Sequence, residues 1–151
     1  MDYTKMFHDE TAFSREYLQN RMEMYGFKNI SRMELFLWDL ELFLQIQKRL
    51  GEHIVLKGGA ATQFYLPIEA QRTSVDIDMI FCGTDEQVQN TLNDITKELG
   101  ERSEFFLFKE HIPKNPKTNL PMHTYHVDVP SVLSYKERNA EEGAVDKQEL
   151  K

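Results

Sequence analysis

Apolar residues recur at helical spacing through the first third of the chain. Over residues 10–25 they return every three or four positions, which predicts an amphipathic helix. Ser31 and Glu34 have the spacing of a capping box, and an apolar-rich segment follows to Leu50, with Gly51 as its stop. Because this second segment is apolar on more than one side, we expect it to be a central packing helix.

Further along the chain, short apolar runs alternate with helical segments. The runs expected to form strands are residues 53–56, 74–81, 103–110 and 122–129. A short helix is expected from about Ala60 to Tyr65, and a longer one after Thr84, which forms a second capping box with Gln87. Helices followed by a β-α-β-α-β-β order predict an α/β (α+β) fold, with a sheet covered by helices on at least one face.

Length and composition favour one globular domain. The chain has 151 residues, of which 40% are apolar, and this is enough for a sizeable core. We expect a core domain over residues 1–134, including N-terminal helices over about residues 1–51. Residues 135–151 are charged with little apolar patterning, and we expect this tail to be frayed helix or disorder.

Charge and cysteine content narrow the classes of protein and the cellular compartments that fit this sequence. A net charge of −7 argues against a protein that coats nucleic acid through bulk charge, although an anionic substrate held through metal ions remains compatible with it. No apolar run reaches the length of a membrane span, and the N-terminus lacks the apolar segment of a signal peptide. The single cysteine, Cys82, fits a reducing compartment, so a cytoplasmic location without membrane partners is expected.

Two aspartates stand one residue apart inside an expected strand. Side chains alternate along a strand, so Asp76 and Asp78 share a face, with their Cα atoms ~7 Å apart at roughly 3.3 Å rise per residue. Two carboxylates at this spacing can reach one hard cation, and Mg²⁺ (or Mn²⁺) commonly takes one or two of them together with substrate phosphates. The alternative to a metal site is an edge of the protein where the strand carries both acids on its solvent-exposed face.

Asp128 lies in a similar setting, on the expected strand at residues 122–129. If this strand lies beside the strand of Asp76 and Asp78, the three acids converge. Three carboxylates can hold two magnesium ions ~3.5–4 Å apart, an arrangement suited to phosphoryl or nucleotidyl transfer. Asp128 would then act as a ligand, a general base or both. A strand-end cap or an ion pair is the alternative role.

A pair of glycines precedes the acids. Gly58 and Gly59 fall between a strand and a helix start, where a backbone without side chains can approach a phosphate closely. Arg72 and Ser74, just before the acids, can supply a cationic fork and a hydroxyl to the same phosphates. Lys57 can pair with a phosphate or with a nearby acid, and a plain tight turn is the alternative for the glycines. Neither standard phosphate-loop pattern occurs in the sequence.

Taken together, these residues resemble a known family. The order of an apolar strand, Lys57-Gly58-Gly59, a short helix, and then Arg72, Ser74, Asp76 and Asp78 is similar to the signature of the AbiEii/AbiGii abortive-infection toxins. These toxins belong to the DNA polymerase β-type nucleotidyltransferase superfamily. The resemblance is close over residues 54–81 and looser from the N-terminal helices through Asp128.

The resemblance implies a nucleotidyltransferase fold with a mixed β-sheet core, and it implies magnesium as the cofactor. The expected reaction transfers a nucleotide from a nucleoside triphosphate to an acceptor such as RNA, including tRNA 3′ ends. The expected partner is a cognate antitoxin. In this assignment Asp76, Asp78 and Asp128 are catalytic metal ligands, and Lys57, Gly58, Gly59, Arg72 and Ser74 bind the nucleotide.

The family also suggests an alternative. Its members usually continue past the third acid into a helical region, which this sequence lacks, so a fragment or truncated product is expected. The alternative function is therefore a non-catalytic nucleotide-binding or interaction module of the same fold. The nucleotide, the acceptor, the antitoxin and the oligomeric state are not encoded in any motif of the sequence.

Overall fold

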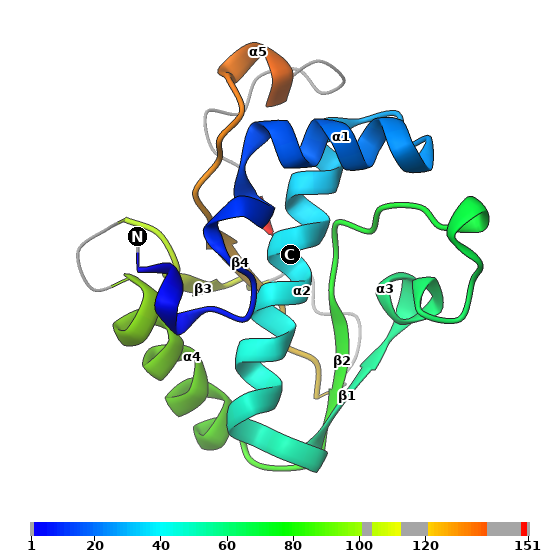
Figure 1. Cartoon of the computed structure of the whole chain (residues 1–151). Coiled ribbons are helices and arrows are strands. Elements are labelled where there is room, and N and C mark those ends of the chain that lie inside the picture. The colour runs from blue at the N-terminus through cyan, green and yellow to red at the C-terminus, as the bar shows by residue number, and fades with distance from the viewer. Residues whose placement is uncertain (1, 101–103, 113–120, 139–148, 151) are drawn as a thin grey trace.

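The computed structural model describes residues 2–100, 104–112, 121–138 and 149–150 (Figure 1). The α-helices in these ranges are α1 (Arg15–Tyr25), α2 (Ile30–Leu50), α3 (Gly58–Gln63), α4 (Asp85–Gly100) and α5 (Tyr135–Arg138). The strands are β1 (Ile54–Lys57), β2 (Asp78–Phe81), β3 (Phe108–Glu110), β4 (Tyr125–Asp128) and β5 (Glu149–Leu150). Helices and small sheets in one chain confirm the predicted α/β class.

Helix α2 is the central element, as its apolar pattern predicts. In Figure 1 it runs vertically through the molecule, with α4 on one side, β1, β2 and α3 on the other, and α1 across its upper end. Long apolar side chains all round the helix suit this position, because neighbours cover it from several directions. Gly51, at φ +59°, ends the helix as expected.

The predicted capping box at the start of α2 is wrong. The side chain of Asn29 caps the helix instead, accepting a hydrogen bond from the backbone N–H of Arg32 at 2.9 Å. Ser31 and Glu34 are buried inside the helix, and the Glu34 carboxylate accepts the N–H of Val132 at 2.7 Å. The Glu34 side chain, which the local pattern assigned to a helix cap, therefore forms its hydrogen bond with a residue almost a hundred positions away in the sequence.

Two other helix starts follow local chemistry. The capping box predicted at α4 is confirmed, since Gln87 Oε1 accepts the N–H of Thr84 at 2.9 Å and Thr84 Oγ1 accepts the N–H of Gln87 at 3.3 Å. The helix expected over residues 10–25 is divided. A 3₁₀ turn covers Glu10–Phe13, and α1 then starts after Ser14, whose hydroxyl caps it.

The described strands form two antiparallel sheets. One pairs β1 with β2, placing Ile54 opposite Phe81 and Lys57 opposite Asp78. The other has the order β3-β4-β5. The strand expected over residues 74–81 is shorter than predicted and begins at Asp78. In the expected tail, α5 and β5 are formed, and residues 139–148 lie outside the described residues.

One apolar cluster joins these parts. Trp38 of α2 is 1% exposed, and its ring centroid lies 4.2 Å from that of Phe13 and 5.6 Å from that of Phe106. The cluster also includes Ile54 of β1, Ile95 of α4 and Val127 of β4, among others. Both sheets and the two long helices therefore share one core.

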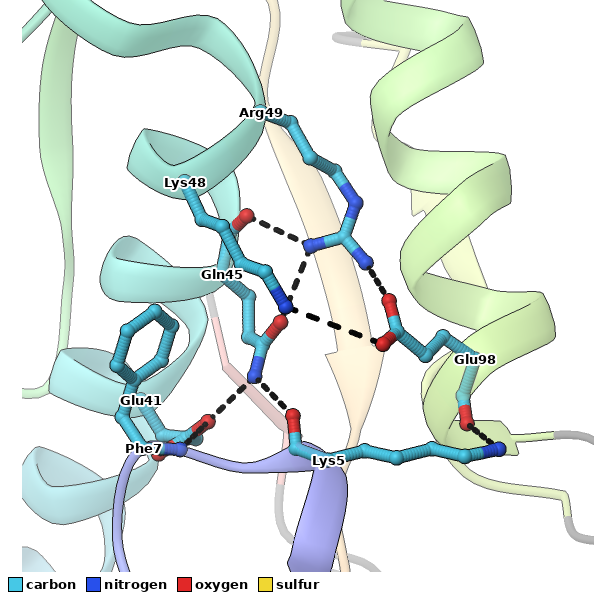
Figure 2. Close-up of polar contacts among 7 residues, drawn as sticks. All are labelled: Lys5, Phe7, Glu41, Gln45, Lys48, Arg49 and Glu98. Carbon is cyan, nitrogen blue, oxygen red and sulfur yellow. Dashed lines mark hydrogen bonds and ion pairs between the residues drawn. The ribbon is translucent and has the colours of Figure 1, made fainter.

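The N-terminal segment is fixed to α2 through a buried carboxylate (Figure 2). Glu41 is 0% exposed, and it accepts the backbone N–H groups of Phe7 and His8 and the side-chain amide of Gln45. Burial raises the pKa of Glu41, but hydrogen bonds from His8, Gln45 and the backbone outweigh this and hold it below its usual value.

None of the helices in the described part of the chain combines the length and apolarity that a membrane span requires.

Candidate functional site

A polar pocket lies beside the start of β2. Its volume is about 220 Å³, and it is lined by Arg32, Gly59, residues 72–76 and Asp78. The lining combines two carboxylates, two guanidinium groups and a glycine backbone. Besides Gly59, the pocket therefore brings together four residues that the sequence assigns to metal or nucleotide binding, namely Arg72, Ser74, Asp76 and Asp78.

The two acids have the orientation that a strand period predicts. Asp78 is the first residue of β2, and Asp76 precedes the strand in extended backbone. Both side chains are exposed, whereas Ile77 and Met79 between and after them are more enclosed. The shared face of Asp76 and Asp78 thus opens into the pocket, and the apolar face turns toward the protein.

Gly58 is required where it stands. Its φ is +72°, and a Cβ at this position would lie only 2.4 Å from Asp78 Oδ2. Any side chain here would displace the carboxylate. Gly59 is also close to the site, because a Cβ on it would meet Ser74 Oγ at 3.3 Å and Arg72 Nη2 at 3.6 Å. The glycines therefore leave space for the acid and the polar groups around it.

Gln63 organises the pocket, although no sequence motif identifies it. It is 4% exposed, its Oε1 accepts the backbone N–H of Arg72 at 2.7 Å, and its Nε2 donates to the carbonyl of Gly59 at 2.9 Å. Ser74 Oγ donates to the carbonyl of Asp76 at 3.3 Å, which fixes the segment that leads to the acids. These bonds join α3 to the chain that carries Arg72 and Asp76.

Arg32 is a second cation that the sequence analysis did not identify. It lies in the first turn of α2, about forty residues before Arg72, and lines the same pocket. Among the described residues, neither guanidinium has an ion-pair partner in the protein. Two unpaired guanidinium groups facing one pocket are suited to phosphate oxygens. Lys57 is not among the described lining residues, and its predicted role stays a prediction.

Asp39 is the other residue that sequence patterns missed. It lies in the middle of α2 and is 0% exposed, and neither of its carboxylate oxygens has a hydrogen-bond partner among the described residues. Burial, together with the smaller effect of the charge of Asp76, raises the pKa of Asp39 to about 8. An acid inside a largely apolar helix looks like an ordinary surface position until the packing is known.

The expected neighbour of β2 is wrong. Asp128 lies on β4, which pairs with β3 and β5, while β2 pairs only with β1 among the described strands. The Asp128 carboxylate lies 3.6 Å from Lys109 Nζ, and it is not among the described lining residues of the pocket. In the described residues, no set of three acidic, histidine or cysteine side chains is arranged to hold one ion. The metal role of Asp128 stays a prediction that the sheet pairing does not favour.

The pocket nevertheless fits a magnesium ion with its substrate phosphates. Magnesium needs oxygen ligands, commonly takes one or two carboxylates, and keeps several water molecules. Asp76 and Asp78 offer the carboxylates on one face, and the side chain of Asp78 lies in the space that Gly58 leaves open.

A larger pocket of about 470 Å³ lies between α2 and α3. Its lining is apolar apart from His8 and the Tyr65 hydroxyl, so it offers no carboxylate or guanidinium to a metal or a phosphate. The polar pocket is therefore the better candidate site, although it is the smaller of the two.

Comparison with known families agrees with this geometry. Residues 42–146 match the family model described as nucleotidyl transferase AbiEii toxin, type IV toxin–antitoxin system. The match includes Gly58, Gly59, Arg72, Asp76 and Asp78, and begins after Arg32 and Asp39. No match was found among the curated proteins or among the solved structures. Since the family model covers more than half of the sequence, the chain belongs to the AbiEii family of nucleotidyl transferase toxins.

Proposed function

We propose that this chain is a metal-dependent nucleotidyltransferase that transfers a nucleotide from a nucleoside triphosphate to a hydroxyl of an RNA acceptor. The observation that supports this most strongly is the placing of Asp76 and Asp78 in one pocket with Arg32, Arg72 and Gly59. Carboxylates for a cation face guanidinium groups for phosphates across a space of about 220 Å³.

Asp76 and Asp78 would hold the magnesium ion, which when bound supplies Lewis-acid stabilisation of the charge that develops on phosphoryl oxygens. The two arginines bind the β- and γ-phosphate oxygens through charge-assisted hydrogen bonds. The acceptor hydroxyl oxygen forms a bond to the α-phosphorus as the bond to pyrophosphate breaks. The hydroxyl proton passes to solvent water, because Asp128, which the sequence predicts as the base, is not among the described lining residues of the pocket.

The glycines and Gln63 position these groups. Gly58 lets the Asp78 carboxylate lie against the backbone, and Gln63 fixes both the Gly59 carbonyl and the Arg72 backbone. A triphosphate therefore meets a preformed arrangement and need not order the loop on binding. The toxin–antitoxin description of the family supports an antitoxin as a further partner.

The test is incorporation of labelled nucleotide into RNA. Each of the four labelled nucleoside triphosphates is incubated with magnesium, RNA and either wild type, Asp76→Ala or Asp78→Ala. We expect incorporation by wild type and a loss of roughly 100-fold or more in both variants, because electrostatic stabilisation of the transition state contributes on this scale. Asp94→Ala, which removes an exposed acid of α4, is the matched control and should keep full activity.

Equal incorporation by all four proteins would exclude the assigned role of the two acids. Absence of incorporation by wild type, combined with magnesium-dependent triphosphate binding in calorimetry, would instead favour the non-catalytic nucleotide-binding module.

A further inference from the structure

The larger pocket, between α2 and α3, adjoins the proposed nucleotide site through α3. Gly59, in the first turn of α3, lines the polar pocket, and Ala61, two residues later, lines the larger one. Positions two residues apart lie about 200° apart around a helix, so the two pockets are on different faces of α3. The helix has six residues and is about 9 Å long, so one extended ligand can reach both pockets.

The lining of the larger pocket suits an uncharged planar group. Phe43, Phe64 and Tyr65 contribute aromatic rings, and none of the described lining residues carries a carboxylate, an ammonium or a guanidinium group. The volume of about 470 Å³ lies in the range of small-ligand sites. A nucleobase is flat, uncharged and able to stack on such rings, whereas a phosphate inside this pocket would meet no cation.

His8 gives this apolar pocket a hydrogen-bonding group with a fixed orientation. Its Nδ1 lies 2.6 Å from Glu41 Oε2, and its backbone N–H donates to the same oxygen at 3.0 Å. Because a carboxylate accepts hydrogen bonds, Nδ1 carries the hydrogen, and Nε2 is the ring nitrogen left for a ligand. When the imidazole is neutral, Nε2 accepts a hydrogen bond, and the amino groups of nucleobases can donate it. An aliphatic side chain from a partner protein would leave Nε2 unmatched.

Two of the aromatic rings extend the pocket at its rim. Tyr65 is 89% exposed and Phe64 is 63% exposed, although both line the pocket. Burial of an aromatic ring is favourable, so two neighbouring rings left largely in solvent mark a surface for a ligand or a partner. Together with Phe43, which is more enclosed, they offer flat apolar surface to more than one base.

Lys48 places a cation near these rings. It follows Leu44, which lines the pocket, by four positions, so the two share a face of α2. Its Nζ lies 6.0 Å from the ring centroid of Phe7, a residue that is 51% exposed (Figure 2). The ion pair between Lys48 and Glu98, 4.0 Å long and solvent-exposed, is weak, so the ammonium group can also contact a phosphate of a bound strand.

We propose that this pocket, with the rings of Phe64 and Tyr65 at its rim, binds unpaired bases of the acceptor RNA close to the hydroxyl that receives the nucleotide. This inference rests on the proposed function. Bases inside a duplex are stacked on each other, whereas bases of a single strand can stack on aromatic side chains with little preference for sequence. The triphosphate donor has one base, and the pocket with its rim offers ring surface to more than one, which favours the acceptor strand.

The probe is a short single-stranded RNA with a fluorescent label, titrated with the full chain without triphosphate or magnesium and followed by fluorescence anisotropy. We expect Tyr65→Ala and Phe64→Leu to weaken binding roughly 5- to 100-fold, the usual effect of losing a ring on which a base stacks. Tyr65→Phe keeps the ring and should recover most of the affinity that Tyr65→Ala loses. Met24→Ala, which removes an exposed apolar side chain of α1, is the matched control and should bind like wild type.

Phe64→Leu distinguishes a base from a protein side chain as the occupant, because leucine stays apolar and lacks the flat ring. If Phe64→Leu and Tyr65→Ala bind the RNA like wild type, or if a blunt duplex of the same sequence binds as tightly as the single strand, the inference is overturned. Weaker triphosphate binding by Tyr65→Ala in calorimetry, with unchanged RNA binding, would assign the pocket to the donor base and would also overturn it.

Failure of this inference differs from failure of the proposed function. Nucleotide incorporation by wild type, combined with RNA binding that does not depend on the two rings, overturns the inference and leaves the proposed function standing. Ring-dependent RNA binding by a wild type that incorporates no nucleotide overturns the proposed reaction and leaves the RNA site.

A second measurement needs no variant. An RNA that carries 5-iodouridine near its acceptor end forms cross-links under ultraviolet light mainly with aromatic side chains that stack on this base. We expect mass spectrometry to locate the cross-links at Phe64 or Tyr65, and unlabelled RNA to compete them away. Cross-links found only outside the pocket and its rim would overturn the inference, whatever the affinities of the variants.

Discussion

The contact between Gly58 and Asp78 shows how one missing side chain shapes the site. Gly58 has φ +72°, a conformation that L-residues adopt at a cost of about 1–2 kcal/mol. A Cβ here would also lie 2.4 Å from an oxygen of Asp78. Backbone strain and steric collision are separate effects. At another glycine of the chain, Gly26, a substitution would cause only the strain.

Gly58→Ala is therefore expected to lower both stability and magnesium-dependent triphosphate binding. Backbone strain reduces the free energy of unfolding, and the added methyl group moves the Asp78 carboxylate away from the pocket. Urea denaturation measures the first effect, and calorimetric titration with a nucleoside triphosphate and magnesium measures the second.

Gly26→Ala is the matched control. Gly26 has nearly the same φ, +70°, but a Cβ there would meet nothing within 4 Å. We expect a loss of stability of about 1–2 kcal/mol with unchanged triphosphate binding. If Gly58→Ala also leaves binding unchanged, the approach of Gly58 to Asp78 does not shape the nucleotide site.

At the scale of elements, α2 carries two buried acids close together in the sequence, Asp39 and Glu41. Asp39 has no hydrogen-bond partner among the described residues, whereas Glu41 holds the N-terminal segment with several donors. Beyond Glu41, the same helix continues the network through Gln45 and Arg49, and Arg49 pairs with Glu98 of α4 (Figure 2). Among the described residues, the Glu41 carboxylate is therefore satisfied by hydrogen bonds, and the Asp39 carboxyl is not.

Glu41→Gln is expected to lower the free energy of unfolding by roughly 1.5–3 kcal/mol, the range for hydrogen bonds to a charged group. The introduced amide presents a donor to the N–H groups of Phe7 and His8. Chemical denaturation measures the change. Glu52→Gln, at an exposed position, is the matched control and should behave like wild type; equal stability of both variants would show that Glu41 does not fix the segment.

The same group predicts a pH dependence. The folded-state pKa of Glu41 is lowered, so its stabilisation is fully present above the ordinary value of 4.5 and is lost as pH falls through the lower folded value. Wild type should therefore lose more stability than Glu41→Gln when the solution is acidified below pH 4.5. Unfolding curves measured at stepwise lower pH test this, and parallel losses in the two proteins would contradict it.

At the scale of the whole molecule, a shared core joins two sheets that do not pair with each other. Trp38 is the single tryptophan and is buried at the centre of this core. Because β1, β4, α2 and α4 all contribute to the cluster, we expect the chain to unfold in one cooperative transition. Tryptophan fluorescence and far-ultraviolet circular dichroism should then give the same denaturation midpoint.

Ile95→Val provides the comparison. Ile95 is 0% exposed in α4, and the substitution should reduce stability by about 0.5–1.5 kcal/mol. In a single cooperative unit both signals shift together, although Trp38 lies on another helix. A shift in the circular dichroism curve alone would show that α4 unfolds separately from α2.

Much of the site follows from short-range sequence patterns. Gly58, Arg72, Ser74 and Asp76 lie within about twenty residues, where a strand, a short helix and a second strand bring them together. The period of two along a strand is enough to put Asp76 and Asp78 on one face, as found. The Thr84 capping box of α4 was predictable for the same reason, since its hydrogen bonds lie within one helical turn.

Long-range packing decided the remainder. The Ser31 and Glu34 spacing was misleading because Glu34 finds a partner at Val132, and Asp128 was misplaced because β4 joins a different sheet. The sequence by itself determined the glycines, the acid pair and the family, because these depend on neighbours along the chain. Only the tertiary structure brought Arg32 to that motif and buried Asp39, because the direction in which a helix packs depends on the whole core.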